Sequence, residues 1–364
     1  MAKKKKIGVL TSGGDCPGLN AVIRGVVKAS ISSSQIDIYG IVDGFCGLIK
    51  KNIIPLDWVK VSGILTLGGT ILGTSNKADP FRWPQKDKNG KTTFIDISDE
   101  VVKYIKKEGF DNLVCIGGDG TMTIAEKLCQ KGVRIIGVPK TIDNDICGTD
   151  ITFGFDTAKS TATEAIDKIH TTAMSHHRVM VIELMGRYAG WLTLEAGIAG
   201  GGDVILIPEL PYELDKIIAE VKRRSKKGRR FSIVVVSEGA KPKGGDLVVK
   251  QKIKDSTDPI RLGGIGNKIT HDIEKHTGLE TRVTVLGHLQ RGGTPTATDR
   301  ILATRFGVKA AELCRTGAGG VMVAVRGNDI VTVPLSDIAG KNRTVNLDHP
   351  LIKIAKEVGS CMGV

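Results

Sequence analysis

Residues 112–150 read NLVCIGGDGTMTIAEKLCQKGVRIIGVPKTIDNDICGTD and predict a strand, a helix and a second strand. Residues 112–116 form a short apolar run that ends at glycine, which is typical of a buried strand. Helical spacing starts at Thr121, and residues 134–138 form the second apolar run. The glycines of the intervening turn, GGDGT, let the backbone approach a bulky anion, and the start of the following helix offers it free N–H groups. The stretch therefore predicts a βαβ unit with a phosphate site at its first turn.

Polar side chains follow the second strand directly, in the motif PKTIDND. The carboxyl ends of parallel strands meet at one edge of a sheet, and ligands of open α/β sheets bind there. We therefore expect Asp119 of the glycine turn to lie near Asp143 and Asp145, with Lys140 and Thr141 beside them. Phosphoryl transfer uses this set of groups: a metal for the phosphate oxygens, a cation for the developing charge and a base for the attacking hydroxyl.

Glycine-rich turns follow three more predicted strands. Residues 7–10 lead into TSGGDCPG, residues 178–184 into MGRYAG and residues 281–286 into GHLQRGG. Each turn also has an ordinary explanation: packing for the first, a surface ion pair for Arg187 and a structural role for His288. The sequence alone leaves both explanations open.

The rest of the chain predicts a larger α/β architecture. Apolar runs predict strands at residues 36–42, 204–208, 231–237 and 321–325. A helix is expected over residues 157–173 with Asp156 as its cap, and Pro17 is expected in the first turn of another helix. Residues 79–98 predict an exposed loop, and the chain beyond the last strand shows no readable chemistry. With 46 glycines, 4% aromatic residues and 364 residues in all, two α/β lobes are expected.

The net charge indicates which class of ligand the protein binds, and the cysteine content indicates the cellular compartment. The net charge is +13, partly from Lys3–Lys6 and from residues 222–230, KRRSKKGRR, which predict a helix end and turn. Because these segments lack interleaved aromatic residues, we expect phosphorylated small molecules and no nucleic acid. The seven cysteines contain no CxxC pair, which is typical of thiols in a reducing compartment. No stretch approaches 18 apolar residues, so the sequence predicts a cytoplasmic protein without a membrane span.

The motifs GGDGT, PKTIDND, MGRYAG and GHLQRGG, in this order, closely resemble those of the phosphofructokinase family of glycolysis. The resemblance runs from Lys6 to about Arg326. It implies two Rossmann-like three-layer lobes with mostly parallel sheets. Residues 1–150 and about 290–340 would form the nucleotide-binding lobe, and residues 151–289 and about 341–364 the sugar-phosphate-binding lobe. It also implies a homodimer or homotetramer in which Arg178 and Arg282 reach a neighbour's site.

The resemblance further implies transfer of a donor's terminal phosphoryl group to the 1-hydroxyl of fructose 6-phosphate. Asp143 would be the base, Thr141 would help place the phosphoryl group, and Arg187 would stabilise its charge. Asp119 would hold Mg²⁺, with Asp145 as a weaker second candidate. The implied contacts to the sugar phosphate are Thr141, Asp143, Arg178, Met185, Gly186, Arg187, Glu238, Arg282, His288 and Arg291. The implied contacts to the nucleotide are Gly14, Phe45, Lys77, Gly118, Asp119, Gly120 and Thr121.

Two nucleotide contacts carry an alternative or a departure from the family pattern. Phe45 follows a predicted strand and fits core packing as well as a place near adenine. Many family members have an arginine that bridges donor and acceptor phosphates where this chain has Asn76. Lys77 is the nearest replacement, but it offers a point charge in place of a bidentate fork.

The donor is ATP or pyrophosphate. Family members that use pyrophosphate usually have aspartate in place of Gly120, where a carboxylate would crowd and repel a nucleotide's α-phosphate, so Gly120 favours ATP. Lys140 favours pyrophosphate, because simple bacterial ATP enzymes often have glycine there. Steric exclusion is harder to evade than an added cation, so we expect ATP.

Other function classes share single features with this chain. NAD kinases and diacylglycerol kinases resemble it in GGDGT, but neither accounts for MGRYAG or GHLQRGG. A non-catalytic sugar-phosphate or nucleotide sensor on the same fold would be expected to lack Asp119 or Asp143, and both are present.

Overall fold

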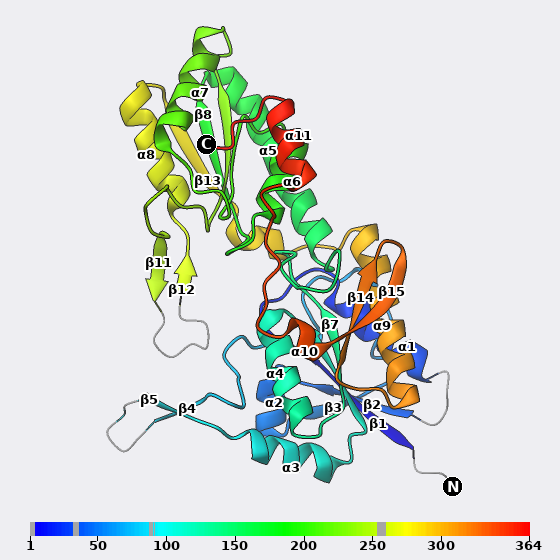
Figure 1. Cartoon of the computed structure of the whole chain (residues 1–364). Coiled ribbons are helices and arrows are strands. Elements are labelled where there is room, and N and C mark those ends of the chain that lie inside the picture. Colours follow the sequence, from blue (N-terminus) through cyan, green and yellow to red (C-terminus); the bar gives the residue numbers. More distant parts are fainter. Residues whose placement is uncertain (1–3, 32–35, 87–89, 91, 253–259) are drawn as a thin grey trace.

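The computed structural model describes residues 4–31, 36–86, 90, 92–252 and 260–364 and shows an α/β protein with two mostly parallel main sheets (Figure 1). The predicted fold class is therefore confirmed. Lys3 of the basic start, and residues 87–89 and 91 of the predicted loop, lie outside the described residues. Across the described residues, none of the helices combines the length and the apolar character needed to cross a membrane.

The larger sheet has seven strands, and it contains the stretch from which the fold is predicted. In spatial order the strands are β15 (Asp329–Pro334), β14 (Val321–Arg326), β7 (Ile135–Pro139), β6 (Asn112–Gly117), β1 (Lys5–Thr11), β2 (Ile36–Ile41) and β3 (Ile53–Leu56). The five central strands are parallel, while β3 and β15 are antiparallel edges. Strands β14 and β15 complete the sheet although they follow β7 by some 180 residues in the chain.

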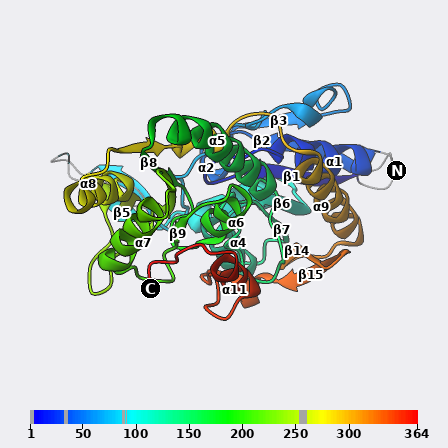
Figure 2. The ribbon, with the colours of Figure 1, turned by 90° about the horizontal axis from the view of Figure 1, so that it is seen from above.

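Helices cover both faces of this sheet (Figure 2). On one face, α1 (Leu19–Ile31) and α9 (Ala297–Thr316) pack on Val9, Val114 and Ile136. The other face carries α2 (Phe45–Lys50), α3 (Ser98–Glu108), α4 (Asp119–Gln130) and α10 (Leu335–Ile338). Alternate residues of the buried parallel strands point to opposite faces, so each face has its own apolar core.

The smaller sheet has four parallel strands, β13 (Thr281–Val285), β8 (Val179–Leu184), β10 (Ser232–Ser237) and β9 (Val204–Leu206). Helices α5 (Phe155–His176) and α6 (Trp191–Ala199) cover one face, and α7 (Leu214–Lys226) and α8 (Ile265–Thr277) cover the other. The remaining elements are hairpins β4–β5 (Trp83–Lys86, Thr92–Ile95) and β11–β12 (Val249–Lys252, Ile260–Leu262), 3₁₀ turns η1 (Ile64–Thr66) and η2 (Gly287–Arg291), and α11 (Pro350–Glu357).

Several local predictions are wrong. Residues 79–98 contain the β4–β5 hairpin and are not a plain loop. Helix α5 begins at Phe155 after Gly154, and Asp156 lies inside its first turn without capping it. Helix α1 begins at Leu19, so Pro17 precedes the helix. Beyond the last clearly predicted strand, the structure adds β15 and α11.

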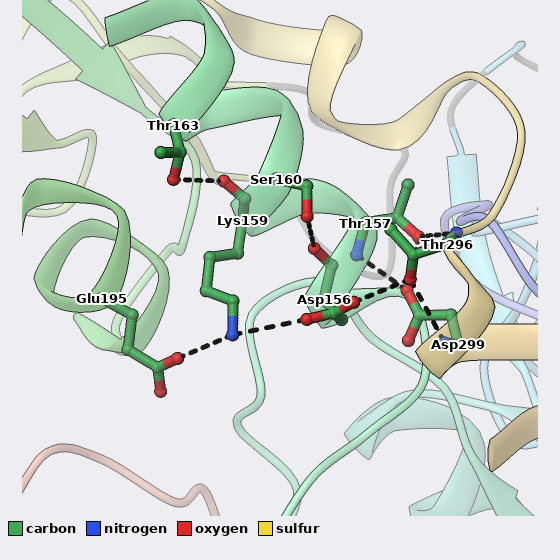
Figure 3. Close-up of polar contacts among 8 residues, drawn as sticks. All are labelled: Asp156, Thr157, Lys159, Ser160, Thr163, Glu195, Thr296 and Asp299. Atoms are coloured by element: carbon green, nitrogen blue, oxygen red, sulfur yellow. Dashed lines mark hydrogen bonds and ion pairs between the residues drawn. The ribbon is translucent and has the colours of Figure 1, made fainter. Parts of the chain in front are cut away.

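A polar cluster joins the first turn of α5 to the first turn of α9 (Figure 3). The buried Asp299 carboxylate accepts hydrogen bonds from Thr157 N at 2.8 Å and Thr157 Oγ1 at 2.5 Å. Thr296 Oγ1 donates to Asp156 at 2.7 Å. Lys159 forms ion pairs with Asp156 at 3.4 Å and with Glu195 of α6 at 3.1 Å. The cluster therefore links a helix of the larger sheet to two helices of the smaller one.

Replacing Asp299 with alanine should lower the free energy of unfolding by about 2–3 kcal/mol, because two donors on Thr157 lose a buried, charged acceptor. Urea unfolding followed by circular dichroism measures this change. Asp167→Ala, at an exposed position of α5, is the control and should change the value by less than about 0.5 kcal/mol. Equal stability of the two variants would contradict the role given to Asp299.

Candidate functional site

The GGDGT turn forms a cradle between β6 and α4. Gly118 precedes the helix, which begins at Asp119, two residues earlier than the spacing indicates. A Cβ at Gly117 would lie 2.2 Å from Thr121 Oγ1, so glycine is required where the turn folds against the helix. A Cβ at Gly120 would have no neighbour within 4 Å. The N-terminus of α4 therefore faces open space, as an anion site at a helix start requires.

The turn after β1 lies beside this cradle. Ser12 N donates to Ile116 O at 2.9 Å, and Gly13 N donates to Ser75 O at 3.1 Å. A Cβ at Gly14 would lie 2.2 Å from a terminal nitrogen of Arg291, so in this structure the guanidinium packs directly against the glycine. The Lys140 ammonium donates to the Gly14 carbonyl. The structure thus brings together Gly14, Lys140 and Arg291 from three separate motifs.

The PKTIDND turn presents two carboxylates at the carboxyl end of β7. Asp143 N donates to Thr141 Oγ1 at 3.0 Å, and Asn144 has a left-handed backbone with φ of 53°. The Asn144 side chain accepts from Thr152 N at 3.1 Å, which holds this conformation. In the part of the chain that the structure describes, Oδ1 of Asp143 and Oδ1 of Asp145 are buried and have no hydrogen-bond partner.

Burial raises the pKa of the carboxylates around this turn. The pKa of Asp143 rises to about 7, first because of burial and then because Asp145 and Glu238 repel its charge, while Arg291 and Arg187 oppose the shift. Burial and Asp145 also raise the pKa of Asp119. A carboxylate whose pKa lies near neutrality is suited to accept a proton from a substrate hydroxyl.

The MGRYAG loop approaches the same place from the smaller sheet. It follows β8, and Arg187 adopts a left-handed backbone with φ of 48°. Arg187 N donates to Glu238 Oε1 at 3.3 Å. A Cβ at Gly239 would lie 1.7 Å from the Arg187 carbonyl, so the residue after Glu238 must be glycine. Met185 N donates at 3.3 Å to the side chain of Gln290, which lies inside GHLQRGG.

Three further predicted site residues differ in how far they are exposed. Phe45 is completely buried in the hydrophobic core, which favours the packing alternative, and its place near adenine stays a prediction. Lys77 is exposed on the loop that follows Ser75, so its role at the nucleotide stays a prediction. His288 is exposed on η2, close in sequence to Arg291.

Arg178 and Arg282 lie at the far end of the smaller sheet. Arg178 precedes β8, whereas Arg187 follows it, and six strand residues span about 20 Å. Both arginines contact the Glu280 carboxylate, at 2.8 Å for Arg178 and 2.5 Å for Arg282. Within one chain they are therefore not placed with Arg187, and a role for them at a neighbour's site stays a prediction.

The carboxylates of the site fit a magnesium ion that a bound phosphate would share. Among the described residues there is no group of three or more His, Cys, Asp or Glu side chains that could hold a metal alone. Asp119, like Asp145, has a buried Oδ1 without a partner, and each carboxylate lies within electrostatic reach of the other. Mg²⁺ is usually held by one or two protein carboxylates together with substrate phosphates and water.

Some contacts at the site are not predicted by the sequence. Thr152, which fixes Asn144, and Gln290, which fixes Met185, lie in or near recognised motifs but have no chemical signal of their own. Gly340 N donates to Thr123 Oγ1 of α4, and the Gly340 amide also lowers the pKa of Asp119. No sequence pattern marks the segment around Gly340 as part of the site.

Replacing Asp143 with asparagine should stabilise the protein at high pH. The pKa of Asp143 is raised on folding, so its contribution to stability is fully present below about pH 4 and is lost as pH rises through about 7. An asparagine side chain cannot ionise, so the variant's melting temperature should exceed that of the unmodified protein by several degrees at pH 8.5, with the difference shrinking towards pH 5. Calorimetry at both pH values measures this. Asp246→Asn, at an exposed position, is the control. A melting-temperature difference that does not change with pH would contradict the raised pKa of Asp143.

Comparison with known proteins gives one consistent result. The sequence model of the family described as "Phosphofructokinase" matches residues 6–314. An ATP-dependent 6-phosphofructokinase 2 of Clostridium perfringens is 52% identical over 98% of this chain and 97% of its own. A pyrophosphate–fructose 6-phosphate 1-phosphotransferase of Amycolatopsis mediterranei is 48% identical over 94% of this chain and 97% of its own.

Solved structures of phosphofructokinases also match this chain. The Pichia pastoris phosphofructokinase in the T-state matches with a TM-score of 0.79 and 32% identity over 99% of this chain. The Saccharomyces cerevisiae phosphofructokinase matches with a TM-score of 0.76 and 32% identity over 98% of this chain. The chain spans 37% and 46% of those two longer chains, respectively.

Proposed function

The chain belongs to the phosphofructokinase family, and we propose that it transfers the terminal phosphoryl group of ATP to the 1-hydroxyl of fructose 6-phosphate, the committed step of glycolysis. The products are fructose 1,6-bisphosphate and ADP. One observation carries the proposal: the buried, unpartnered carboxylate of Asp143 lies at the sheet edge that also holds the glycine cradle, with Arg187 and Arg291 in electrostatic reach. The carboxylate can act as a base, the glycine cradle can bind a phosphate, and the arginines can neutralise the charge of that phosphate.

The mechanism follows from these positions. Asp143 would accept the proton of the sugar's 1-hydroxyl as that oxygen attacks the phosphoryl group, and its pKa of about 7 keeps a large part of it ionised at neutral pH. Thr141 would help place the phosphoryl group. The positive charge of Arg187 would stabilise the negative charge that develops on the phosphoryl group. The backbone of Arg187 is held in place by Glu238 and by the space at Gly239. Asp119, with Asp145 as the weaker candidate, would hold Mg²⁺, which would neutralise phosphate charge when bound.

The remaining contacts are proposed from the family match. The sugar phosphate would be held by Met185, Gly186, Glu238, His288 and Arg291, with Arg178 and Arg282 supplied by a neighbouring subunit. The nucleotide would lie on Gly14, Gly118, Asp119, Gly120 and Thr121. We further propose the two lobes given above, with boundaries near residues 150, 290 and 340, a homodimer or homotetramer, and a cytoplasmic enzyme. Light scattering that gives a monomer mass would contradict the shared site.

The structure bears on the donor through Gly120 and Lys140. Gly120 has open space around it, which leaves room for a nucleotide's α-phosphate. The Lys140 ammonium is buried and binds the Gly14 carbonyl, so this lysine has a structural partner that joins the two glycine turns. Its presence is therefore explained without pyrophosphate. The relatives include enzymes named for either donor, so we rest the choice of ATP on Gly120.

Replacing Asp143 with serine should lower turnover by about 10²–10⁴-fold, because the base is lost. The affinity for fructose 6-phosphate should stay near normal, since the groups proposed to bind its 6-phosphate are untouched. Coupled assay of fructose 1,6-bisphosphate with ATP and Mg²⁺ measures turnover, and equilibrium binding measures affinity. Turnover near that of the unmodified enzyme would show that Asp143 is not the base.

Replacing Gly120 with aspartate should lower kcat/KM for ATP by about 10²-fold, because the new carboxylate would face the α-phosphate. Activity with pyrophosphate should fall less, because pyrophosphate has no third phosphate to face the new carboxylate. The unmodified enzyme, assayed with each donor at the same Mg²⁺ concentration, is the reference. If it works only with pyrophosphate, ATP is the wrong donor. If neither donor works, the alternative of a non-catalytic sugar-phosphate or nucleotide sensor holds.

A further inference from the structure

The segment from Gly340 to Val345, which we term the strap, runs from α10 beside the larger sheet to α11 beside the smaller one (Figure 1). It lies beyond residue 314, where the match to the family's sequence model ends. The strap contacts three parts of the proposed site, and Arg343 lies at its centre.

The first contact is with the turn that carries Asp143 and Asp145. Ile146 and Asn342 form an antiparallel β-bridge. Arg343 N donates to Asp145 O at 2.7 Å, and a terminal nitrogen of the Arg343 side chain donates to Asn144 O at 3.3 Å. Arg343 therefore holds two successive carbonyls of this turn, including that of Asn144, which has a left-handed backbone.

The second contact is with the end of the MGRYAG loop. Trp191 follows this loop directly and begins α6. The Arg343 guanidinium lies over the indole ring at 4.3 Å from its centre, and Trp191 Nε1 donates to Arg343 O at 3.1 Å. A planar guanidinium can stack on an aromatic ring and donate in its own plane at the same time, which a lysine ammonium cannot do.

Each end of the strap is fixed by a hydrogen bond to a different part of the chain. Glu209 Oε1 accepts from Val345 N at 2.8 Å and from Gly190 N, the last residue of the MGRYAG loop, at 2.9 Å. At the other end, Gly340 N donates to Thr123 Oγ1 at 3.0 Å, one turn after Asp119 in α4. The strap thus ties the GGDGT helix, the PKTIDND turn and the MGRYAG loop to one another.

We propose that Arg343 is a positioning residue for phosphoryl transfer: it holds the turn of Asp143 and Asp145 in register with the loop of Arg187. The inference rests on the function proposed above. Asp143 and Arg187 are carried by different sheets, so their separation depends on what joins the two segments. A displacement of about 1 Å between reacting groups can cost about 10²-fold in rate. Arg343 touches no reacting atom, so its loss should affect turnover more than substrate binding.

The test compares Arg343→Ala and Arg343→Lys with the unmodified enzyme in the same assay. We expect kcat to fall by about 10–100-fold in both, since lysine cannot stack and donate together, while KM for ATP and for fructose 6-phosphate stays within about threefold. Hydrogen exchange of the amides in residues 141–146 should speed up by at least about tenfold in Arg343→Ala. This second measurement does not depend on activity.

Arg224→Ala is the matched control. Arg224 is also a partly buried arginine, and it pairs with Asp203 at 2.8 Å near the start of β10, at the opposite end of the smaller sheet from Arg187. Its loss should lower the melting temperature without a selective fall in kcat and without faster exchange in residues 141–146. Trp191→Phe, which keeps the ring and removes the bond to Arg343 O, should give a smaller fall in kcat and serves if Arg343→Ala does not fold.

The outcomes distinguish failure of the positioning role of Arg343 from failure of the proposed phosphoryl-transfer activity. An unmodified enzyme that is inactive with both donors overturns the proposed function, whatever the variants do. An active unmodified enzyme, together with unchanged kcat in Arg343→Lys and Trp191→Phe, overturns the positioning role. A fall in kcat that Arg224→Ala reproduces in full would show that Arg343 contributes only to general stability, and would overturn it as well.

Discussion

The cost of removing carboxylates from water governs the organisation of this protein. Asp119, Asp143, Asp145 and Glu238 lie together at the carboxyl edges of two sheets, and burial is the largest cause of the raised pKa of each. Unpaired buried charge is destabilising, so such a cluster persists only where the surrounding fold fixes it. In this chain it is fixed by strands whose apolar residues are fully buried on both sides of the turns that carry the acids. The carboxylates proposed to act on a phosphorylated substrate are thus the groups whose burial costs this fold most.

Compensation comes from cations on other segments. Arg187 and Arg291 lower the pKa of Asp143 against the effect of burial, and each comes from a loop after a strand of the smaller sheet. Arg291 packs directly against Gly14, and Arg187 is held by Glu238 and by the space at Gly239. Glycine acts in two ways at these turns. It allows an unusual backbone, and it leaves room for a guanidinium or a carbonyl of another segment.

The parts of this arrangement that the sequence can predict are those set by local patterns. The β6–α4–β7 unit is predictable because a change from strand to helix spacing across GGDGT is visible within about 25 residues. The β4–β5 hairpin is not, because its strands are polar, contain a proline and lack a clear alternation. The local pattern predicts Asp156 as the cap of α5, but its carboxylate bonds Thr296, which is 140 residues away, and no local rule contains that partner.

The proposed site residues also divide into those that local sequence patterns predict and those that depend on distant contacts. Asp143, Arg187 and Arg291 stand in motifs that can be recognised as short strings. Phe45 can be given two roles from the sequence, and only its complete burial in the fold supports packing. Arg343 bonds Asn144 across 199 residues and stands in no motif, so its contacts become visible only in three dimensions.

The pairing of β14 with β7 has a consequence for how the chain is made. Strand β7 ends at Pro139, but its second neighbour in the sheet begins at Val321, after the whole four-stranded sheet. While the chain leaves the ribosome, the first half therefore carries an apolar strand with one unpaired edge until the last part of the chain has been synthesised. An open edge of this kind invites pairing with other chains, and contacts between such distant segments form slowly. The order of the strands along the chain thus makes this edge of β7 the expected site of misassembly during synthesis.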